Sequence, residues 1–310
     1  MERRALLRLG LGALAGASAM GLAGRRAGAQ APSAGPVITR PIPSSGEALP
    51  VVGLGTWITF DIGRDPAARR RRREVLETLF AGGGTVIDSS PMYGRAEGVV
   101  GDLLTEMGAR TRAFLATKVW TEGAERGRRQ MEESFSLFRT DRIELMQIHN
   151  LVDWRAHLPT LQAWKEEGRF RYIGITHYTP GAFDRVMSVL AHERLDFVQI
   201  PYSIAVREAE SRLLPLAAER EVAVIANRPF EGGNLFGKIR GRDLPAWARE
   251  FDCESWAQFF LKFLLGHPAM TCVIPGTERP DYMRDNLGAA RGRLPDGPTR
   301  ERMARLVAEL

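Results

Sequence analysis

The sequence predicts an α/β protein, a (β/α)8 TIM barrel with a short N-terminal hairpin. Between residues 51 and 290, short apolar runs alternate with amphipathic helical patterns. The runs are apolar throughout, which is typical of parallel strands covered on both faces. Several runs end on a polar residue, and a barrel gathers its functional side chains at the C-terminal ends of its strands. A doubly wound open sheet is the alternative, but the run Gly53-Leu54-Gly55-Thr56-Trp57 lacks the third glycine of its usual first turn.

The elements follow one another in a regular order. Residues 37–50 contain Pro41, Pro43 and the turn signal Ser44-Ser45-Gly46-Glu47, which predicts a small hairpin. We expect the barrel strands at residues 51–55, 85–88, 113–118, 143–149, 172–176, 197–201, 223–226 and 272–274. Helical patterns occur at residues 68–81, 96–107, 125–138, 158–167, 181–190, 208–220, 254–265, 280–290 and 299–310. Glycines at 82–84, 168 and 266 stand where helices should stop.

Residues 1–29 are expected to be a twin-arginine-like signal peptide and not part of the fold. Arg3-Arg4 precede a weakly apolar stretch rich in glycine and alanine, and Ala27-Gly28-Ala29 has the small-x-small pattern of a cleavage site. The modest hydrophobicity favours the twin-arginine (Tat) route over Sec, while a Sec signal or an uncleaved anchor is the alternative. The sequence therefore predicts a periplasmic protein whose single barrel domain spans residues 30–310.

Charge says little about partners once this segment is set aside. The chain has a net charge of +6, and residues 1–29 hold five arginines and one glutamate, so the remainder is near +2. We therefore expect no nucleic-acid partner. We also expect no membrane insertion after cleavage, because no later apolar run approaches the roughly 18 residues that a span requires. The basic run at residues 69–73 opens a helical pattern and is expected to be a solvated helix face, not an anion site.

The cysteines and histidines indicate no metal site. Cys253 and Cys272 are too few for a disulfide framework, although an exported protein could join them. The five histidines are scattered, and no spacing typical of metal ligands occurs.

Four polar residues carry the chemical prediction. Asp88, Tyr93, Lys118 and His149 stand in the segments VIDSSPMYG, AFLATKVW and LMQIHN. Only four of the 43 basic residues are lysines, so a lysine within an apolar strand is unusual here. A compact ammonium can sit against a phenol and lower its pKa, which a planar guanidinium does less well. The set favours proton transfer to a carbonyl oxygen with tyrosine as the acid. A structural Lys118–Asp88 pair is the alternative.

With these residues in place, the chain resembles the aldo-keto reductase family over residues 37–286. The motif Asp88-x4-Tyr93-Gly94, with Lys118 and His149 on the next two strands, matches the catalytic tetrad of that family. The resemblance implies an enzyme that reduces an aldehyde or ketone with NADPH and catalyses the reverse reaction. Tyr93 would donate the proton, Lys118 paired with Asp88 would stabilise the phenolate, and His149 would orient the carbonyl.

The resemblance also implies a set of cofactor contacts. Thr176 and His177 replace the family's usual Ser-Asn pair at the carboxamide, and Asn227 stands where a tyrosine often stacks on the nicotinamide. Gly276 and Tyr282 replace two basic residues that commonly hold the 2′-phosphate, so NADH is an alternative to NADPH, unless Arg279 or Arg284 supplies a fork. The expected cofactor residues are Gly55, Thr56, Trp57, Thr176, His177, Gln199, Asn227, Phe230, Gly232, Gly233, Leu235, Gly276, Thr277, Arg279 and Asn286.

The substrate side is defined only by its chemistry. Trp57, Trp120 and Trp154 fall on loops at the same end of the barrel and could wall an apolar pocket for a small carbonyl substrate. The chain ends in a helical pattern without a long loop, so we expect an open site in a monomer or weak oligomer. The alternative function is a nucleotide-binding regulatory or sensor subunit with little turnover, which would not need all four tetrad side chains.

Overall fold

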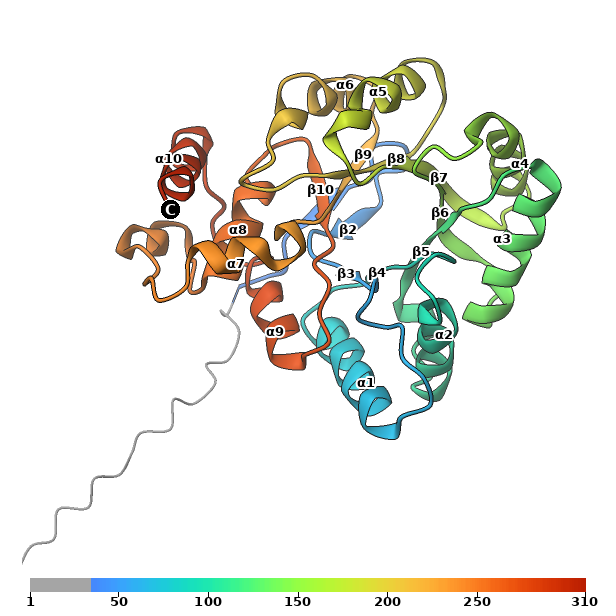
Figure 1. The fold of residues 1–310 in the computed structure, drawn as a ribbon, viewed down its shortest axis with the longest axis horizontal. Helices are drawn as coiled ribbons and strands as arrows, with labels where there is room; N and C mark the ends of the chain where they lie inside the picture. Colours follow the sequence, from blue (N-terminus) through green and yellow to red (C-terminus); the bar gives the residue numbers. More distant parts are fainter. Residues whose placement is uncertain (1–34) are drawn as a thin grey trace, which may run out of the picture. The chain divides into compact units, whose positions relative to one another are not determined.

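The computed structural model describes residues 35–310, and the predicted signal segment lies outside the described residues. Eight strands form one sheet in the order β10-β9-β8-β7-β6-β5-β4-β3, and each neighbouring pair is parallel. Isolated parallel bridges join Val52 to Val273 and Gly55 to Gly276, which brings the first and last strands together. Figure 1 shows the resulting ring of strands with helices around it. The predicted (β/α)8 barrel is confirmed.

The strand bounds agree closely with the sequence pattern. The hairpin strands β1 (Thr39–Pro41) and β2 (Ala48–Pro50) pair antiparallel, as predicted. The barrel strands are β3 (Leu54–Gly55), β4 (Val86–Asp88), β5 (Phe114–Val119), β6 (Ile143–His149), β7 (Phe170–Thr176), β8 (Phe197–Pro201), β9 (Ala223–Asn227) and β10 (Met270–Val273). β3 is shorter than predicted because residues 51–53 meet β10 only through a bridge at the seam.

The seam between β3 and β10 requires glycine. A Cβ atom at Gly55 would lie 2.8 Å from the carbonyl oxygen of Ile274, too close for a real contact. Gly55 therefore lets the two strands approach where the ring closes.

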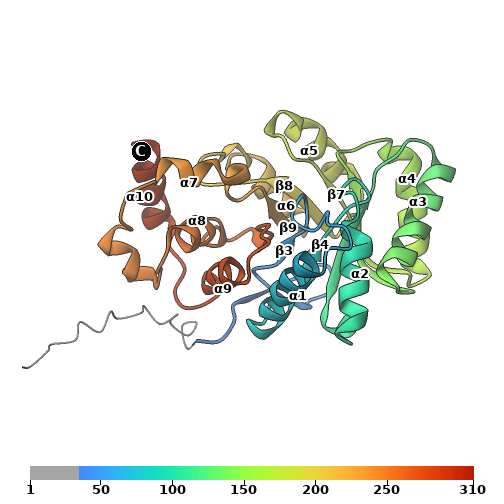
Figure 2. The same cartoon turned by 60° about the horizontal axis from the view of Figure 1, so that its bottom comes forward.

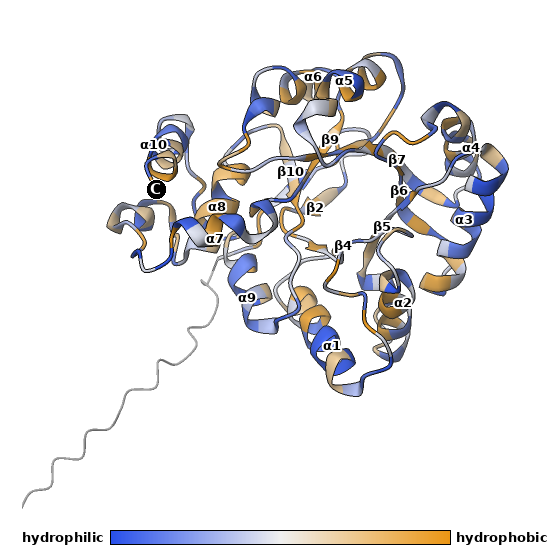
Figure 3. Ribbon diagram, in the orientation of Figure 1, coloured by the Kyte–Doolittle hydropathy of each residue, from blue (hydrophilic) through white to orange (hydrophobic). Residues whose placement is uncertain are grey.

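Helices surround the barrel and cover its outer face. They are α1 (Pro66–Ala81), α2 (Ala96–Glu106), α3 (Ala124–Phe138), α4 (Trp154–Glu166), α5 (Phe183–His192), α6 (Leu213–Glu219), α7 (Asn234–Lys238), α8 (Trp256–Leu265), α9 (Pro280–Gly288) and α10 (Gly297–Ala308). Their starts follow capping rules, since Asp65 accepts from the amides of Ala67 and Ala68, and Pro66 occupies the first turn. Figures 2 and 3 show these helices outside the ring, with polar residues on many of their outward faces.

Two helical predictions need correction. The pattern at residues 208–220 begins as a 3-10 turn at Glu208–Glu210, and α6 starts only at Leu213. The short helix α7 follows β9 where no helix was expected. Both changes fall in connecting segments, where tertiary contacts outweigh local periodicity.

The basic run in α1 is not uniformly solvated. Arg70, Arg71 and Arg73 are exposed, as predicted, but Arg72 is buried. Arg72 Nε donates to the carbonyl oxygen of Thr59 at 2.5 Å, and its Nη2 pairs with Glu278 at 2.7 Å. Arg72 therefore ties the loop after β3 to the loop after β10, next to the seam.

The interior of the barrel has an apolar layer at the N-terminal ends of the strands. Ile42 and Leu49 of the hairpin region lie in the same cluster, so the hairpin supplies apolar groups to this end. We call this cluster the lower layer; it consists of Ile42, Leu49, Val86, Phe114, Ala116, Leu145, Tyr172, Phe197, Ala223, Ile225, Cys272 and Ile274.

Two further properties concern the described residues only. Cys253 and Cys272 are buried free thiols. Among residues 35–310, no helix combines the length and apolar character needed to cross a membrane.

Candidate active site

The inward-facing positions become polar two to four residues beyond the lower layer. Along β4, Val86 is followed on the same face by Asp88, and along β8, Phe197 is followed by Gln199, because strand side chains alternate between faces. We call the polar set the upper layer; it consists of Asp88, Lys118, Gln147, His149, Thr176, Gln199 and Asn227. All seven lie toward the C-terminal ends of the strands, where a barrel places its chemistry.

Asp88 and Lys118 form a buried ion pair. Lys118 Nζ donates to Asp88 Oδ2 and to the carbonyl oxygen of Ser89, both at 2.7 Å, and the Lys118 side chain has no exposed surface. Burial, the largest single effect, would lower the pKa of Lys118, but Asp88 and Tyr93 together outweigh burial, and the pKa is raised. Lys118 is therefore a fixed positive charge.

Tyr93 lies beside that charge, on the loop after β4. Lys118 Nζ is 5.0 Å from the centroid of the Tyr93 ring. Burial raises the pKa of the phenol, and the Lys118 charge lowers it only in part. The Lys118 charge thus acts on the phenol in the predicted direction, but burial outweighs it, and the sequence pattern does not report how far the ring is desolvated. Tyr93 remains protonated at neutral pH, as a proton donor must be.

His149 faces Tyr93 from the end of β6. The two rings are 5.9 Å apart and nearly perpendicular, at 86°. The Nδ1 atom of His149 lies 3.0 Å from Ser90 Oγ, and Ser90 Oγ accepts a hydrogen bond from the amide of Met92. Burial, followed by the Lys118 charge, lowers the pKa of His149 to about 2. His149 is therefore a neutral imidazole oriented by Ser90.

The second oxygen of Asp88 is held by two amide side chains. Gln199 Nε2 donates to Asp88 Oδ1 at 2.8 Å, and Gln147 Nε2 donates to the same oxygen at 3.3 Å. Gln199 was predicted as a cofactor residue; Gln147 was not predicted. Gln147 stands two residues before His149 in β6, so the period of two could have placed it on the same face.

The carboxamide positions form the outer edge of the upper layer. Gln199 Oε1 accepts from Thr176 Oγ1 at 3.3 Å and from Asn227 Nδ2 at 3.4 Å. Asn227 Nδ2 also donates to the carbonyl oxygen of His177 at 3.0 Å. The His177 ring accepts from the amides of Tyr178 and Thr179, so its Nδ1 shapes its own loop.

This edge fits a nicotinamide carboxamide. Asn227 Oδ1 is buried and has no hydrogen-bond partner within residues 35–310. Such an acceptor suits the NH2 group of a primary amide, since buried polar atoms are normally paired. Asn227 therefore offers hydrogen bonding where the family often has an aromatic ring, and Phe230 does not replace that ring. Phe230 packs instead against Phe236, at 4.9 Å between centroids, and against Phe260.

The loop after β9 separates core from exposed residues. Gly232 and Gly233 are exposed and have positive φ angles of 66° and 99°, which glycine adopts without strain. Leu235 is buried in the core and is not placed to touch a ligand with its side chain. Of the three cofactor residues predicted in this loop, only Gly232 and Gly233 present exposed backbone.

The first loop is anchored to β4. Thr56 Oγ1 donates to the carbonyl oxygen of Asp88 and to Ser89 Oγ, both at 2.9 Å, so its hydroxyl is already engaged. Trp57 follows and is 46% exposed. Of the three predicted wall residues, Trp120 has its ring 6.4 Å from His149, while Trp154 stacks with Arg155.

The segment expected to hold the 2′-phosphate, after β10, is acidic as well as basic. Gly276 forms the bridge to Gly55, and Thr277 is buried with its hydroxyl accepting from the amide of Arg279. Arg279 makes a bidentate pair with Asp281, at 3.1 and 2.6 Å, and its guanidinium lies over Tyr282. Asn286 is buried in α9. Arg279 is therefore already paired and is not a free phosphate fork.

A second buried carboxyl lies just outside the upper layer. Glu97 Oε1 on α2 accepts from Thr117 Oγ1 at 2.5 Å and from Ser134 Oγ at 2.9 Å. Burial raises the pKa of Glu97 to about 7, against the opposing effect of these hydroxyls and of Lys118. Unlike Asp88, Glu97 has no ion-pair partner within the described chain.

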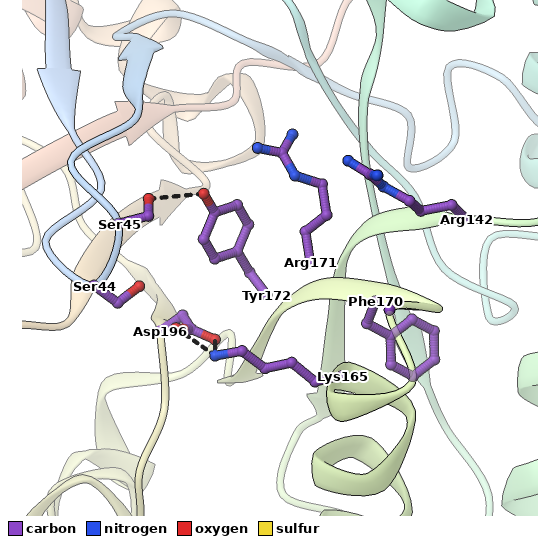
Figure 4. A pocket seen from close by; sticks show the side chains of 9 residues that line it. Ser44, Ser45, Arg142, Lys165, Phe170, Arg171, Tyr172 and Asp196 are labelled. Carbon is purple, nitrogen blue, oxygen red and sulfur yellow. Dashed lines mark hydrogen bonds and ion pairs between the residues drawn. The ribbon is translucent and has the colours of Figure 1, made fainter.

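A cavity of about 410 Å³ lies at the opposite end of the barrel (Figure 4). Its cations are mostly neutralised, since Lys165 pairs with Asp196 and Arg171 pairs with Glu47. None of the tetrad residues lines this cavity, so it is separate from the candidate site. No group of three or more His, Cys, Asp or Glu side chains within residues 35–310 is arranged to hold a metal ion.

The chain is similar in sequence to characterised proteins and in fold to solved structures. The chain is 30% identical to Aldo-keto reductase YhdN of Bacillus subtilis over 206 residues, 61% of this chain and 60% of YhdN, so the match spans less than two thirds of that relative. It is 24% identical to the NADH-specific methylglyoxal reductase of Escherichia coli, over 83% of this chain and 94% of that protein. The crystal structure of aldo-keto reductase from Klebsiella pneumoniae in complex with NADPH has a TM-score of 0.70 and 25% identity, covering 84% of this chain and 92% of the other.

The family assignment rests on the match to a family profile. The profile of the Aldo/keto reductase family matches residues 51–299, which include every strand of the barrel and all four tetrad positions. The chain therefore belongs to the Aldo/keto reductase family.

Proposed function

We propose that this protein is a nicotinamide-dependent carbonyl reductase, which reduces aldehydes or ketones to alcohols and catalyses the reverse reaction. One observation carries the proposal: Tyr93 lies between the Lys118 ammonium, 5.0 Å from its ring, and the neutral His149 ring at 5.9 Å. A proton donor and a second hydrogen-bonding group therefore stand side by side, where one carbonyl oxygen can meet both.

The side chains divide the work on that oxygen. A bound nicotinamide supplies the hydride. Tyr93 gives its phenolic proton to the carbonyl oxygen, and the Lys118 charge stabilises the phenolate that remains. With Ser90 donating to Nδ1, His149 carries its proton on Nε2 and polarises the carbonyl by hydrogen bonding. Its pKa of about 2 means that it does so as a neutral ring.

The cofactor is held by the outer edge of the upper layer. Asn227, Thr176 and Gln199 offer hydrogen bonds to the carboxamide, and the exposed backbone of Gly232 and Gly233 is available to the pyrophosphate. NADPH is the proposed hydride donor, and NADH is the alternative, because the names of the compared proteins include both.

The test is a carbonyl-dependent loss of reduced nicotinamide. Purified protein is mixed with NADPH or NADH and a panel of aldehydes and ketones that includes methylglyoxal, and the reduced cofactor is followed by absorbance. We expect oxidation that requires both the protein and a carbonyl compound. Tight nucleotide binding without such oxidation would support a regulatory or sensor subunit instead.

We further propose that the protein is exported by the twin-arginine route, which carries folded proteins. The proposal rests on Arg3-Arg4 and the cleavage pattern ending at Ala29. Joint Arg3→Lys and Arg4→Lys substitution should leave an active precursor in the cytoplasm and no mature form that begins near Gln30. A mature periplasmic product from this variant would indicate Sec export.

A further inference from the structure

Gln147 has no part in the proposed reaction, yet it lies at the centre of the upper layer. Its side chain is fully buried, it pairs in register with Lys118 of the neighbouring strand, and it precedes His149 by two residues. A buried primary amide has two donors and one acceptor, and each of them costs free energy if it lacks a hydrogen-bond partner. We therefore ask what the Gln147 amide does at this position.

Its hydrogen bonds join the two halves of the site. Gln147 Nε2 donates to Asp88 Oδ1 at 3.3 Å, and Gln147 Oε1 accepts from Gln199 Nε2 at 3.4 Å. Asp88 is thus held by amides on Oδ1 and by Lys118 on Oδ2. Three strands, β5, β6 and β8, supply the donors, so the carboxylate has one orientation.

We propose that Gln147 is a positioning residue, which fixes the Asp88 carboxylate against Lys118 and thereby sets the proton affinity of Tyr93. The inference rests on the proposed function and deepens it. The physical reason is electrostatic: the negative charge of Asp88 disfavours a phenolate at Tyr93, and an amide N–H pointed at Asp88 offsets part of that charge. Removing the amide makes the phenolate less stable.

Other groups around Asp88 hold constant charge near neutral pH. Lys118 from β5 is positive and its pKa is raised. His149 from β6 is neutral, and the Cys272 thiol from β10 has a pKa raised by burial. Glu97 on α2 is the exception, because it interacts with the Lys118 charge and has a pKa of about 7. The pH profiles are therefore measured in a Glu97→Gln background, so that titration of Glu97 does not contribute to them.

The test compares Gln147→Met with Thr271→Val. Methionine keeps the length and volume of glutamine but donates no hydrogen bond. Thr271 is the control, because it is buried in β10 and its hydroxyl accepts from the amide of Val224 at 3.0 Å, away from Asp88. For each variant we would measure thermal stability, nucleotide Kd and the pH dependence of kcat/KM for alcohol oxidation, which requires the Tyr93 phenolate.

Gln147→Met should move the oxidation profile upward by roughly half to one pH unit. This is less than the roughly one to two units of a hydrogen bond made directly to a charged group, because the amide acts on Tyr93 only through Asp88. Nucleotide Kd should change by less than about threefold, because the direct carboxamide groups remain. Gln147→Glu should shift the profile further in the same direction, since a second carboxylate would face Asp88. Thr271→Val should lose stability without moving the profile.

An unmoved profile in Gln147→Met, with a stability loss like that of Thr271→Val, would overturn the proposal and leave Gln147 a structural residue. If the wild type reduces no carbonyl compound, the proposed function fails separately. The Gln147 proposal is then decided by ultraviolet titration: the tyrosinate signal lost in Tyr93→Phe should titrate higher in the Gln147→Met background, and an equal pKa in both backgrounds would refute it.

Discussion

The two layers inside the barrel are built from the same strands but have opposite chemistry. In β6, Leu145 lies in the apolar lower layer, and Gln147 and His149 lie above it in the upper layer. The lower layer gains stability from burial, and its one hydroxyl, on Tyr172, is paired with Ser45 and Glu47. The upper layer places an ion pair and three amide side chains in the same interior, which pays only if each is paired. The difference indicates that one end stabilises the fold and the other carries the reaction.

The largest expected effect comes from removing the proton donor. Tyr93→Phe deletes one hydroxyl at the upper layer and should lower the rate of carbonyl reduction by about two to four orders of magnitude, the usual contribution of a positioned acid. Nucleotide Kd should stay within a few-fold, because Tyr93 is not among the carboxamide groups. Steady-state kinetics and fluorescence titration measure the two quantities, and unchanged turnover would remove Tyr93 as the acid.

Breaking the ion pair should cost both activity and stability. Lys118→Met leaves Asp88 buried without its cation, which typically costs about 3–5 kcal/mol of unfolding free energy, and should abolish turnover. Lys118→Arg should not restore it, because the fully buried Nζ makes 2.7 Å bonds to Asp88 and Ser89 that a planar fork cannot reproduce in the same space. Near-normal turnover with arginine would show that charge alone is sufficient.

A cavity in the lower layer should lower the stability of the protein but leave its activity unchanged. Leu49→Ala removes apolar volume from the floor of the barrel and should lower the free energy of unfolding by about 2–5 kcal/mol. The kcat of the folded fraction should stay near that of the wild type. Leu137→Ala, at a side chain that is 36% exposed, is the matched control and should cost far less. Urea denaturation gives the stabilities, and a large kcat loss in Leu49→Ala would deny the separation of the two layers.

Glu97, a buried carboxyl just outside the upper layer, sharpens the comparison further. The pKa of Glu97 is raised from 4.5 to about 7 by burial, so the native state holds this proton more tightly than the unfolded chain does. Its stabilising contribution is complete below pH 4.5 and is lost as pH rises toward 7. Relative to Glu97→Gln, the wild type should therefore lose about 1–3 kcal/mol across this window. The free energy of unfolding of both proteins is measured from pH 4 to pH 8 by urea denaturation. If it depends on pH in the same way in the wild type and in Glu97→Gln, the raised pKa of Glu97 is contradicted.

The smallest effect is expected at the surface, outside both layers. Arg279 is paired with Asp281 and both side chains are 53% exposed, so Arg279→Ala should reduce NADPH affinity by less than about 1 kcal/mol. NADH affinity should not change. Isothermal titration with both cofactors measures this, and a loss of more than tenfold for NADPH alone would show that Arg279 leaves Asp281 to hold the phosphate.

Much of the fold could be predicted because each strand has a continuous apolar run. The bounds of β6 and β8 were predicted to the residue, and the four tetrad positions followed from the polar residues that end the runs. The burial of Arg72 also had a signal: it precedes Val75, Leu76 and Leu79 at helical spacing, on the face that packs inward.

What could not be predicted depends on contacts between strands. The pairing of Gln147 with Asp88 spans 59 residues and three strands, and no local pattern specifies it. The raised pKa of Tyr93 depends on the sum of burial against the Lys118 charge, and only the folded structure gives both. Phe230 was expected to contact the cofactor, and its packing against Phe236 and Phe260 could not be predicted because these two residues come from separate helices.

The most direct test of the central claim is deuterium transfer. The protein is incubated with NADPH carrying deuterium at C4 of the nicotinamide and with a carbonyl compound that it turns over, and the product is analysed by mass spectrometry. The account predicts an alcohol with deuterium on the former carbonyl carbon for the wild type, and almost none for Tyr93→Phe at equal nucleotide occupancy. Equal deuterated alcohol from both proteins, or none from the wild type with any carbonyl compound while NADPH is bound, would contradict it.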